Sequence, residues 1–526
     1  MKQYIVLAAL AAASLVAKAQ EPINTLWHLE PNNKKGNSGI GLTEAQEMVK
    51  GKTATTVVVA IADAGVDIYH PDLKTMLWTN TGEIEDNGID DDENGYVDDI
   101  NGWNFLGETT YDNMELTREY ARLNAIYELK DLDQTKNQEE YLRYQTLKEA
   151  YLNESQEAKF YFQIFEQVKV GMELLEKEYG SSPTKDQLAN HKSKSRSEQI
   201  TTQILQGIIK DSKELDYAAV KEEMEGAYKQ YDFMYNYGFN VDFNPRTEKV
   251  GDDYSNPNEQ GYGNNNVYYG EEFSEHGTHV AGIVAADASN DFGTKGICQS
   301  CKIMSVRNVP QGDERDKDVA NGIRYAVDNG AKIVNMSFGK SYAQNIQVVK
   351  EAIRYAESKN VLLIHAAGND GKNNDNSENY PNDFNGEFNN WIEVGASSWQ
   401  KKPKALADFS NYGEAEVDLF APGVAIYSTT PENQYEAFDG TSMASPVVSG
   451  VAAFVWSYYP SLTAVELKKI LLDSAIPIRG RNRIPGASKK HIFSRIPRTC
   501  VTEISKTGGQ VNLPAALRLA EERTNM

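Results

Sequence analysis

Three side chains in widely separated motifs could together perform nucleophilic catalysis. Asp63 ends the apolar stretch VVVAIAD, His276 opens HGTHVAG, and Ser442 lies in DGTSMASP. A serine hydroxyl is a weak nucleophile until a neighbouring base accepts its proton, and histidine is the usual base near neutral pH. A carboxylate beside the ring holds its tautomer and stabilises the imidazolium. These residues predict attack by Ser442 on an electrophilic carbon, with His276 as base and Asp63 as its support.

The residues around Ser442 suit a negatively charged intermediate. Small neighbours leave room for a substrate carbonyl, and the apolar run MASPVVSGVAAFVWSYY predicts a helix that begins at the serine. The first amides of a helix lack intrahelical partners and point toward any developing negative charge. We therefore expect the backbone N–H of Ser442 to be one oxyanion donor and the side-chain amide of Asn369, in AAGND, to be the second.

His276 and His279 lie three residues apart, a spacing at which two histidines can share a metal ion. Zinc sites need further ligands, and no acidic residue stands at a suitable spacing from this pair. We therefore interpret His276 as a base and not as a metal ligand.

The motifs of Asp63, His276 and Ser442, in that order and with AAGN between the last two, resemble those of the subtilisin-like serine proteases. The resemblance covers most of residues 50–105 and 267–475. It implies hydrolysis of peptide bonds in protein or peptide substrates through an acyl-enzyme on Ser442. It also implies that Asn369 is the side-chain oxyanion donor. The resemblance further implies that Ser337, Phe338 and Gly339, in NMSFG, form an edge near the primary pocket. Extended substrate backbone would pair with this edge.

Two features depart from that family's pattern. Most relatives carry Ser or Thr after the catalytic aspartate, where a hydroxyl can support the carboxylate, whereas this chain has Ala64. Only a few dozen residues precede the first strand, too few for the folded N-terminal propeptide of many relatives. We expect either that folding needs no such helper or that the inserted segment, residues 106–266, replaces it.

The acidic loop NGIDDDENGYVDDINGWNF resembles a Ca²⁺-binding loop because its oxygen-bearing residues follow the D-x-D-x-N-G spacing. Asn101 replaces the usual bidentate Glu at position twelve, so Asp99 or water would complete the shell. The alternative is a solvated acidic turn without a metal. The predicted ligands of a structural Ca²⁺ are Asp90, Asp92, Asn94, the Tyr96 carbonyl and Asp98.

Short β-branched runs such as TTVVVAIAD, KIMSVRNV and NVLLIHAAGND alternate with segments of helical period such as DVANGIRYAVDNG. Continuous apolar strands between helices predict an α/β fold: a doubly wound, mainly parallel sheet that helices cover on both faces. The predicted peptidase domain comprises residues 20–105 and 267–526.

Residues 106–266 break this pattern and predict an inserted α-helical hairpin or bundle. Apolar residues recur there at spacings of three and four from Tyr144 to Tyr179, and Gly180 ends the helix. The stripe predicts a packed core. Because both ends of the insertion join the chain near catalytic motifs, we expect a lid that restricts which substrates enter. The alternative is an arm for a dimer or another partner.

The N-terminal residues 1–19 predict a secretory signal peptide, because a lysine precedes a short apolar run that ends in the small-x-small motif AKA. We expect an extracytoplasmic protein, periplasmic or secreted, because no later apolar run is long enough for a membrane span. The net charge of −23 argues against a nucleic-acid partner. In an exported protein, Cys298 and Cys301 predict a small disulfide, while Cys500 has no evident partner.

Together these features predict an exported serine endopeptidase. The alternative is a catalytically silent, calcium-stabilised binding protein that displays the helical insertion.

Overall fold

A computed structural model describes residues 25–31, 39–128, 137–211, 216–488 and 496–525. The chain forms two compact units: a helical unit, whose described part lies within Tyr111–Asn244, and a larger unit made of Asn24–Thr110 and Pro245–Met526. The predicted signal peptide, residues 1–19, lies outside the described residues. Within the described ranges, no helix is long and apolar enough to cross a membrane.

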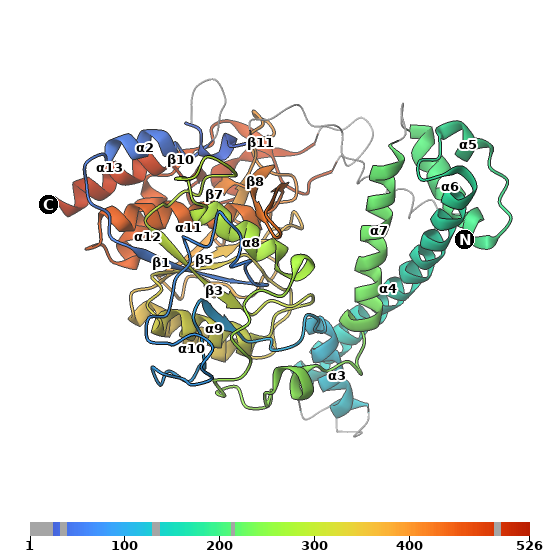
Figure 1. Ribbon diagram of the computed structural model, residues 1–526, viewed down its shortest axis with the longest axis horizontal. Coiled ribbons are helices and arrows are strands. Elements are labelled where there is room, and N and C mark those ends of the chain that lie inside the picture. The colour runs from blue at the N-terminus through green and yellow to red at the C-terminus, as the bar shows by residue number, and fades with distance from the viewer. Residues whose placement is uncertain (1–24, 32–38, 129–136, 212–215, 489–495, 526) are drawn as a thin grey trace. The chain divides into compact units, whose positions relative to one another are not determined.

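In the described part of the larger unit, nine strands form one sheet in the order β10-β13-β7-β6-β5-β4-β1-β3-β2 (Figure 1). All pairings are parallel except that of β10 with β13. The predicted mainly parallel α/β sheet is therefore confirmed. The strands are β1 (Val57–Asp63), β2 (Gly102–Asn104), β3 (Cys301–Arg307), β4 (Ile333–Met336), β5 (Leu362–Ala366), β6 (Trp391–Ser397), β7 (Leu419–Pro422), β10 (Ile476–Pro477) and β13 (Gly509–Gln510).

Helices cover both faces of this sheet (Figure 1). Successive residues of a strand point to opposite faces. Ala60 and Ala62 of β1 belong to a buried cluster that includes residues of α9 and α10. Asp63 therefore lies on the other face, where α8 and α11 pack against β1. These four helices are α8 (Glu271–Ala285), α9 (Asp316–Asp328), α10 (Ile346–Ser358) and α11 (Thr441–Tyr458).

The remaining elements of the larger unit are short and lie around the sheet. Strands β8 and β9 form an antiparallel hairpin that packs against α8, and β11 pairs with β12. These elements are η1 (Trp27–Leu29), α2 (Leu42–Met48), η3 (Arg246–Val250), β8 (Ile426–Thr430), β9 (Gln434–Phe438), α12 (Ala464–Asp473), β11 (Arg481–Arg483), β12 (Arg498–Cys500), η4 (Val501–Glu503) and α13 (Leu513–Thr524).

A buried ionic network joins the segment 245–266 to α9. Arg246 forms paired hydrogen bonds of 2.7 and 2.8 Å with each of two carboxylates, Asp252 and Asp318. Lys317 also binds Asp252, at 2.8 Å, and the Tyr262 hydroxyl donates to Asp318. Buried charges are tolerated when they are paired in this way. The segment 245–266, which the sequence analysis places in the insertion, thus packs within the larger unit.

The helical unit is built around a single long helix, α4. The residues of its predicted stripe are mostly buried, and Phe165, Val168 and Met172 form a core with the helices that follow. Gly171 lets α6 approach closely, because a Cβ there would lie 2.1 Å from Thr201 Oγ1. The helices are α3 (Glu115–Tyr127), α4 (Gln138–Tyr179), α5 (Lys185–Asn190), α6 (Arg196–Asp211), α7 (Tyr217–Phe233) and the π-helical turn η2 (Met234–Gly238).

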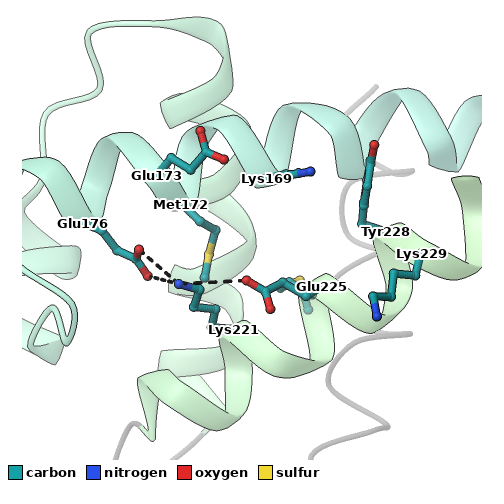
Figure 2. A pocket seen from close by; sticks show the side chains of 9 residues that line it. Lys169, Met172, Glu173, Glu176, Lys221, Glu225, Tyr228 and Lys229 are labelled. Carbon is teal, nitrogen blue, oxygen red and sulfur yellow. Dashed lines mark hydrogen bonds and ion pairs between the residues drawn. The ribbon is translucent and has the colours of Figure 1, made fainter. Parts of the chain in front are cut away.

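A groove of about 340 Å³ lies between α4 and α7, with methionine side chains and charged groups in its walls (Figure 2). Lys221 Nζ contacts Glu176 Oε1 at 2.8 Å and Glu225 Oε1 at 3.9 Å. Lysine and glutamate side chains occur in equal number along its lining, so the groove has no dominant charge.

Cys298 and Cys301 form a disulfide with Cα atoms 5.5 Å apart, as predicted, and Cys500 is a free, exposed thiol. The disulfide lies at the start of β3, so it closes the turn that leads into this strand.

Candidate active site

The structure brings Asp63 and His276 together from 213 residues apart in the chain. Asp63 is the last residue of β1 and is 1% exposed. His276 lies in α8, and its Nδ1 is 2.8 and 3.0 Å from the two Asp63 carboxylate oxygens. Gly277 allows this approach, because a Cβ there would lie only 2.2 Å from the Gly65 carbonyl oxygen.

The surroundings of His276 favour its protonated form. Burial disfavours the charged ring, but the Asp63 charge and hydrogen bond outweigh that effect and raise the pKa of His276 above its usual value of 6.5. The side chain is still 40% exposed. A ring with Nδ1 held by a carboxylate and a raised pKa can accept a proton at Nε2 and later return it.

His279 has a structural role in this fold. It is fully buried, its Nε2 lies 3.1 Å from the Glu436 carbonyl oxygen, and burial lowers its pKa to about 3. It therefore stays neutral and packs in the core.

Ser442 lies in the first turn of α11, after the cap residue Gly440. Its Oγ donates to the Ser337 carbonyl at 3.1 Å, and Ser337 Oγ donates back to the Ser442 carbonyl at 2.8 Å. In this structure the Ser442 hydroxyl thus bonds to the predicted substrate edge. Contacts between nucleophile and base often tighten only when substrate binds. Rotation about the Cα–Cβ bond of Ser442 would redirect its hydroxyl.

Asn369 is tied to the residue that precedes Ser442. Its Oδ1 accepts from the Thr441 backbone N–H at 2.8 Å and from the Thr441 hydroxyl at 3.0 Å. The Thr441 hydroxyl also accepts from the Gly368 N–H at 3.1 Å. Because the carbonyl end of the amide is held, its NH₂ end is the one that can donate to a substrate oxyanion. Thr441 is a supporting residue that the sequence analysis missed.

The predicted substrate edge follows β4. Asn335 Nδ2 donates to Ser337 Oγ at 2.9 Å, which fixes the start of the edge. At its end, a Cβ on Gly339 would lie 2.5 Å from Asn379 Oδ1. Asn379 Nδ2 in turn donates to the Ala366 carbonyl at 3.1 Å, at the end of β5. The edge and the segment before Asn369 are thus joined by Asn379, a residue that no sequence motif indicated.

The acidic loop brings three carboxylates together. Ligand oxygens of Glu83, Asp90 and Asp92 lie within 4.8 Å of one another. Asp90 and Asp92 were predicted from the loop's spacing, but Glu83 was missed because it precedes the motif. Three converging carboxylates form a donor set of the kind that Ca²⁺ prefers.

Among the other predicted loop ligands, Asn94 bonds to two members of this cluster, because its backbone N–H donates to Asp90 Oδ1 at 3.0 Å and to Asp92 Oδ1 at 3.1 Å. Asn94 Oδ1 accepts from the Tyr96 backbone N–H at 2.8 Å, and the Tyr96 ring packs in the core. Asp98 accepts from the backbone N–H groups of Asn87 at 3.1 Å and Gly88 at 2.9 Å. The structure therefore does not bring Asp98 into the carboxylate cluster.

A model of the subtilase family matches residues 54–496. Subtilisin DY of Bacillus licheniformis is 35% identical over 209 residues, which are 39% of this chain and 72% of that protein. Thermitase of Thermoactinomyces vulgaris is 40% identical over 206 residues, 39% of this chain and 68% of that protein. Other curated relatives are matched over about half of their length.

Among solved structures, sphericase matches 49% of this chain and 82% of its own, with 28% sequence identity and a TM-score of 0.39.

Proposed function

Because this chain belongs to the subtilase family, we propose that it is a serine endopeptidase that hydrolyses peptide bonds through Asp63, His276 and Ser442. The observation that carries the proposal is the contact of both Asp63 oxygens with His276 Nδ1, at 2.8 and 3.0 Å. This contact leaves Nε2 of the ring to act as the base.

In the proposed reaction, Ser442 Oγ attacks the carbonyl carbon of the scissile peptide while its proton passes to His276 Nε2. The carbonyl oxygen becomes an oxyanion, which accepts hydrogen bonds from the Ser442 N–H and the Asn369 NH₂ group. When the C–N bond breaks, the leaving amine takes the proton from His276, and an acyl-enzyme remains. Water then attacks the ester carbonyl, gives its proton to His276 and releases the acid, and Ser442 regains its proton.

A fluorophosphonate probe tests this assignment, because it forms a covalent bond only with an activated serine. We expect labelling of the wild type at Ser442, and neither labelling nor peptide cleavage by the Ser442→Ala variant. A folded wild-type protein that is not labelled and cleaves no peptide would favour the catalytically silent binding protein instead.

We also propose that the acidic loop holds a structural Ca²⁺ through Glu83, Asp90 and Asp92. The support is the convergence of their oxygens within 4.8 Å, since carboxylate oxygens are the ligands that Ca²⁺ prefers. Bound Ca²⁺ would stabilise the loop between β1 and β2. Calcium titration of the wild type and of Glu83→Gln tests the site, and Asp98→Asn is the control outside the cluster.

We further propose that the protein is exported. The support is the signal-peptide pattern of residues 1–19. Cell fractionation together with N-terminal sequencing of the mature protein tests this proposal, which predicts a new N-terminus close to Gln20 and no mature protein in the cytoplasm.

A further inference from the structure

Arg307, the last residue of β3, is a buried arginine without a carboxylate partner among the described residues. It is 1% exposed and pairs in register with Asp63 on the neighbouring strand β1. Arg246 is nearly as buried, at 2% exposed, but two carboxylates, Asp252 and Asp318, bind its guanidinium. The two arginines therefore share a burial level and differ in what neutralises their charge.

This difference appears in the acidity of the two groups. Burial lowers the pKa of Arg307 to about 10, whereas the Asp318 and Asp252 interactions outweigh burial and raise the pKa of Arg246. The charge of Glu108 acts on Arg307 but does not outweigh burial. A buried charge without a directly bonded carboxylate costs folding free energy, so stability does not explain its presence. Perturbed groups of this kind concentrate at functional sites.

The contacts of the Arg307 guanidinium hold the turn that follows the catalytic carboxylate. Nε donates to the Ala64 carbonyl at 3.1 Å. Nη1 donates to Asn104 Oδ1 at 2.8 Å, and Nη2 donates to the Thr109 carbonyl at 2.9 Å. The backbone N–H of Ala64 itself donates to Asp63 Oδ1 at 2.7 Å. The arginine thus fixes the residue whose amide orients the Asp63 carboxylate.

The face of the same guanidinium contacts the segment that leads into α8. The ring centroid of Tyr269 lies 4.4 Å from the Arg307 Cζ, a cation–π distance. The Tyr269 hydroxyl donates to Glu108 at 2.6 Å. The Tyr269 backbone N–H donates to Ser274 Oγ at 2.9 Å, two residues before His276 in α8. Arg307 therefore lies between the Asp63 turn and the start of the helix that carries His276.

We propose that Arg307 is a positioning residue for the Asp63–His276 pair, which holds the Ala64 turn and the Tyr269 segment in the geometry that the pair requires; this inference rests on the proposed catalytic function. Ala64 has no hydroxyl to support the carboxylate, so this support comes from the backbone that Arg307 fixes. A guanidinium suits the task because its donors point in several fixed directions within one plane.

The first test compares Arg307→Met with Arg307→Lys on a peptide substrate, at a temperature well below the unfolding midpoint of each variant. Loss of triad geometry should lower kcat by about 10- to 100-fold in Arg307→Met with little change in KM. Arg307→Lys keeps a charge but not the planar set of donors, so an intermediate kcat is expected. Arg246→Lys is the matched control, and we expect it to lower the thermal midpoint with kcat nearly unchanged.

The pH dependence of kcat/KM separates positioning from a simple effect of charge. The charged groups that act on His276 are Asp63 on β1 and Glu275 on its own helix. If Arg307→Met loosens the contact of Asp63 with His276, the pKa of His276 falls. The acid limb of the pH profile, where kcat/KM rises with pH, then moves to lower pH. If Arg307 acted only through its positive charge, its removal would move this limb to higher pH, and that result would overturn the proposal.

Variants of Tyr269 keep the proposal testable even if Arg307→Met does not fold. Tyr269→Leu removes the aromatic face and should lower kcat and shift the acid limb in the same direction, whereas Tyr269→Phe keeps the ring and should have little effect. If fluorophosphonate labels the wild type but the variants have a normal kcat and an unshifted acid limb, this inference is refuted and the proposed function is not. A wild type without labelling or cleavage would refute the proposed function and this inference with it.

Discussion

The Asn369 amide offers a sharp test of the site, because the structure shows which end of it is already engaged. Both hydrogen bonds to Oδ1 come from Thr441, at 2.8 and 3.0 Å. If the NH₂ end stabilises the oxyanion, Asn369→Ala removes a donor that acts mainly in the transition state. We expect kcat to fall on the order of 10²–10³-fold with little change in KM.

Two further substitutions should lower kcat by different amounts. Asn369→Asp keeps an oxygen for both Thr441 bonds and replaces the donor by a negatively charged acceptor, so we expect a loss of kcat at least as large as for alanine. Thr441→Val removes the hydroxyl but leaves the backbone N–H that holds Asn369. The hydroxyl also accepts from Gly368, but only its bond to Asn369 holds the oxyanion donor directly. The loss of about 1 kcal/mol for that one neutral hydrogen bond corresponds to roughly a fivefold fall in kcat.

Steady-state kinetics on one peptide substrate, with thermal unfolding of each variant as a check on folding, measures the series. We expect kcat to fall from the wild type to Thr441→Val, and to fall further in the two Asn369 variants. An Asn369→Ala variant with wild-type kcat, or an Asn369→Asp variant more active than alanine, would refute the oxyanion assignment.

Three other predictions follow from the same structure. The kcat/KM of the wild type should rise with pH through the pKa of His276, which lies above 6.5, and Asp63→Asn should move this limb to lower pH; a pH-rate profile without such a shift contradicts the pairing. Excess chelator should lower the thermal midpoint of the wild type, because Ca²⁺ that binds only the native state stabilises it. Glu83→Gln should reduce this response to chelator. An equal response in both proteins would argue against the site. Replacement of residues 111–244 by a short Gly/Ser linker should leave a folded enzyme with unchanged kcat/KM on small peptides and broader cleavage of proteins. Removal of the longer segment 106–266 should destabilise the enzyme. Equal effects of the 111–244 replacement on small and large substrates would contradict the predicted lid.

Local patterns in the sequence were enough to predict the framework of the fold. The strands β1, β3 and β5 lie where short β-branched runs predicted them, because a buried parallel strand needs a continuous apolar segment. The long helix α4 follows the predicted stripe and ends before Gly180. The disulfide between Cys298 and Cys301 was also predictable, since the two residues are close in the chain.

The end of the inserted segment was harder to predict from the sequence. Residues 245–266 belong to the segment 106–266, which was predicted as the helical insertion. In the structure, Arg246 and Tyr262 of this segment bind Asp318 of α9. A charged residue has the same local pattern whether it is solvated or buried against a distant partner, so its role depends on contacts that the sequence does not reveal.

The sequence by itself determined which residues could perform the chemistry and in which strands and helices they lie, because motif spacing and hydrophobic period are local properties. Only the tertiary structure placed Asp63 against His276, added Glu83 to Asp90 and Asp92, and buried Arg307 with no directly bonded carboxylate among the described residues. The Asp63–His276 and Arg307 contacts arise where segments from separate parts of the chain meet, whereas Glu83 and the two aspartates meet through the folding of one loop. Their energies depend on distance and burial, and neither quantity is defined until the chain has folded.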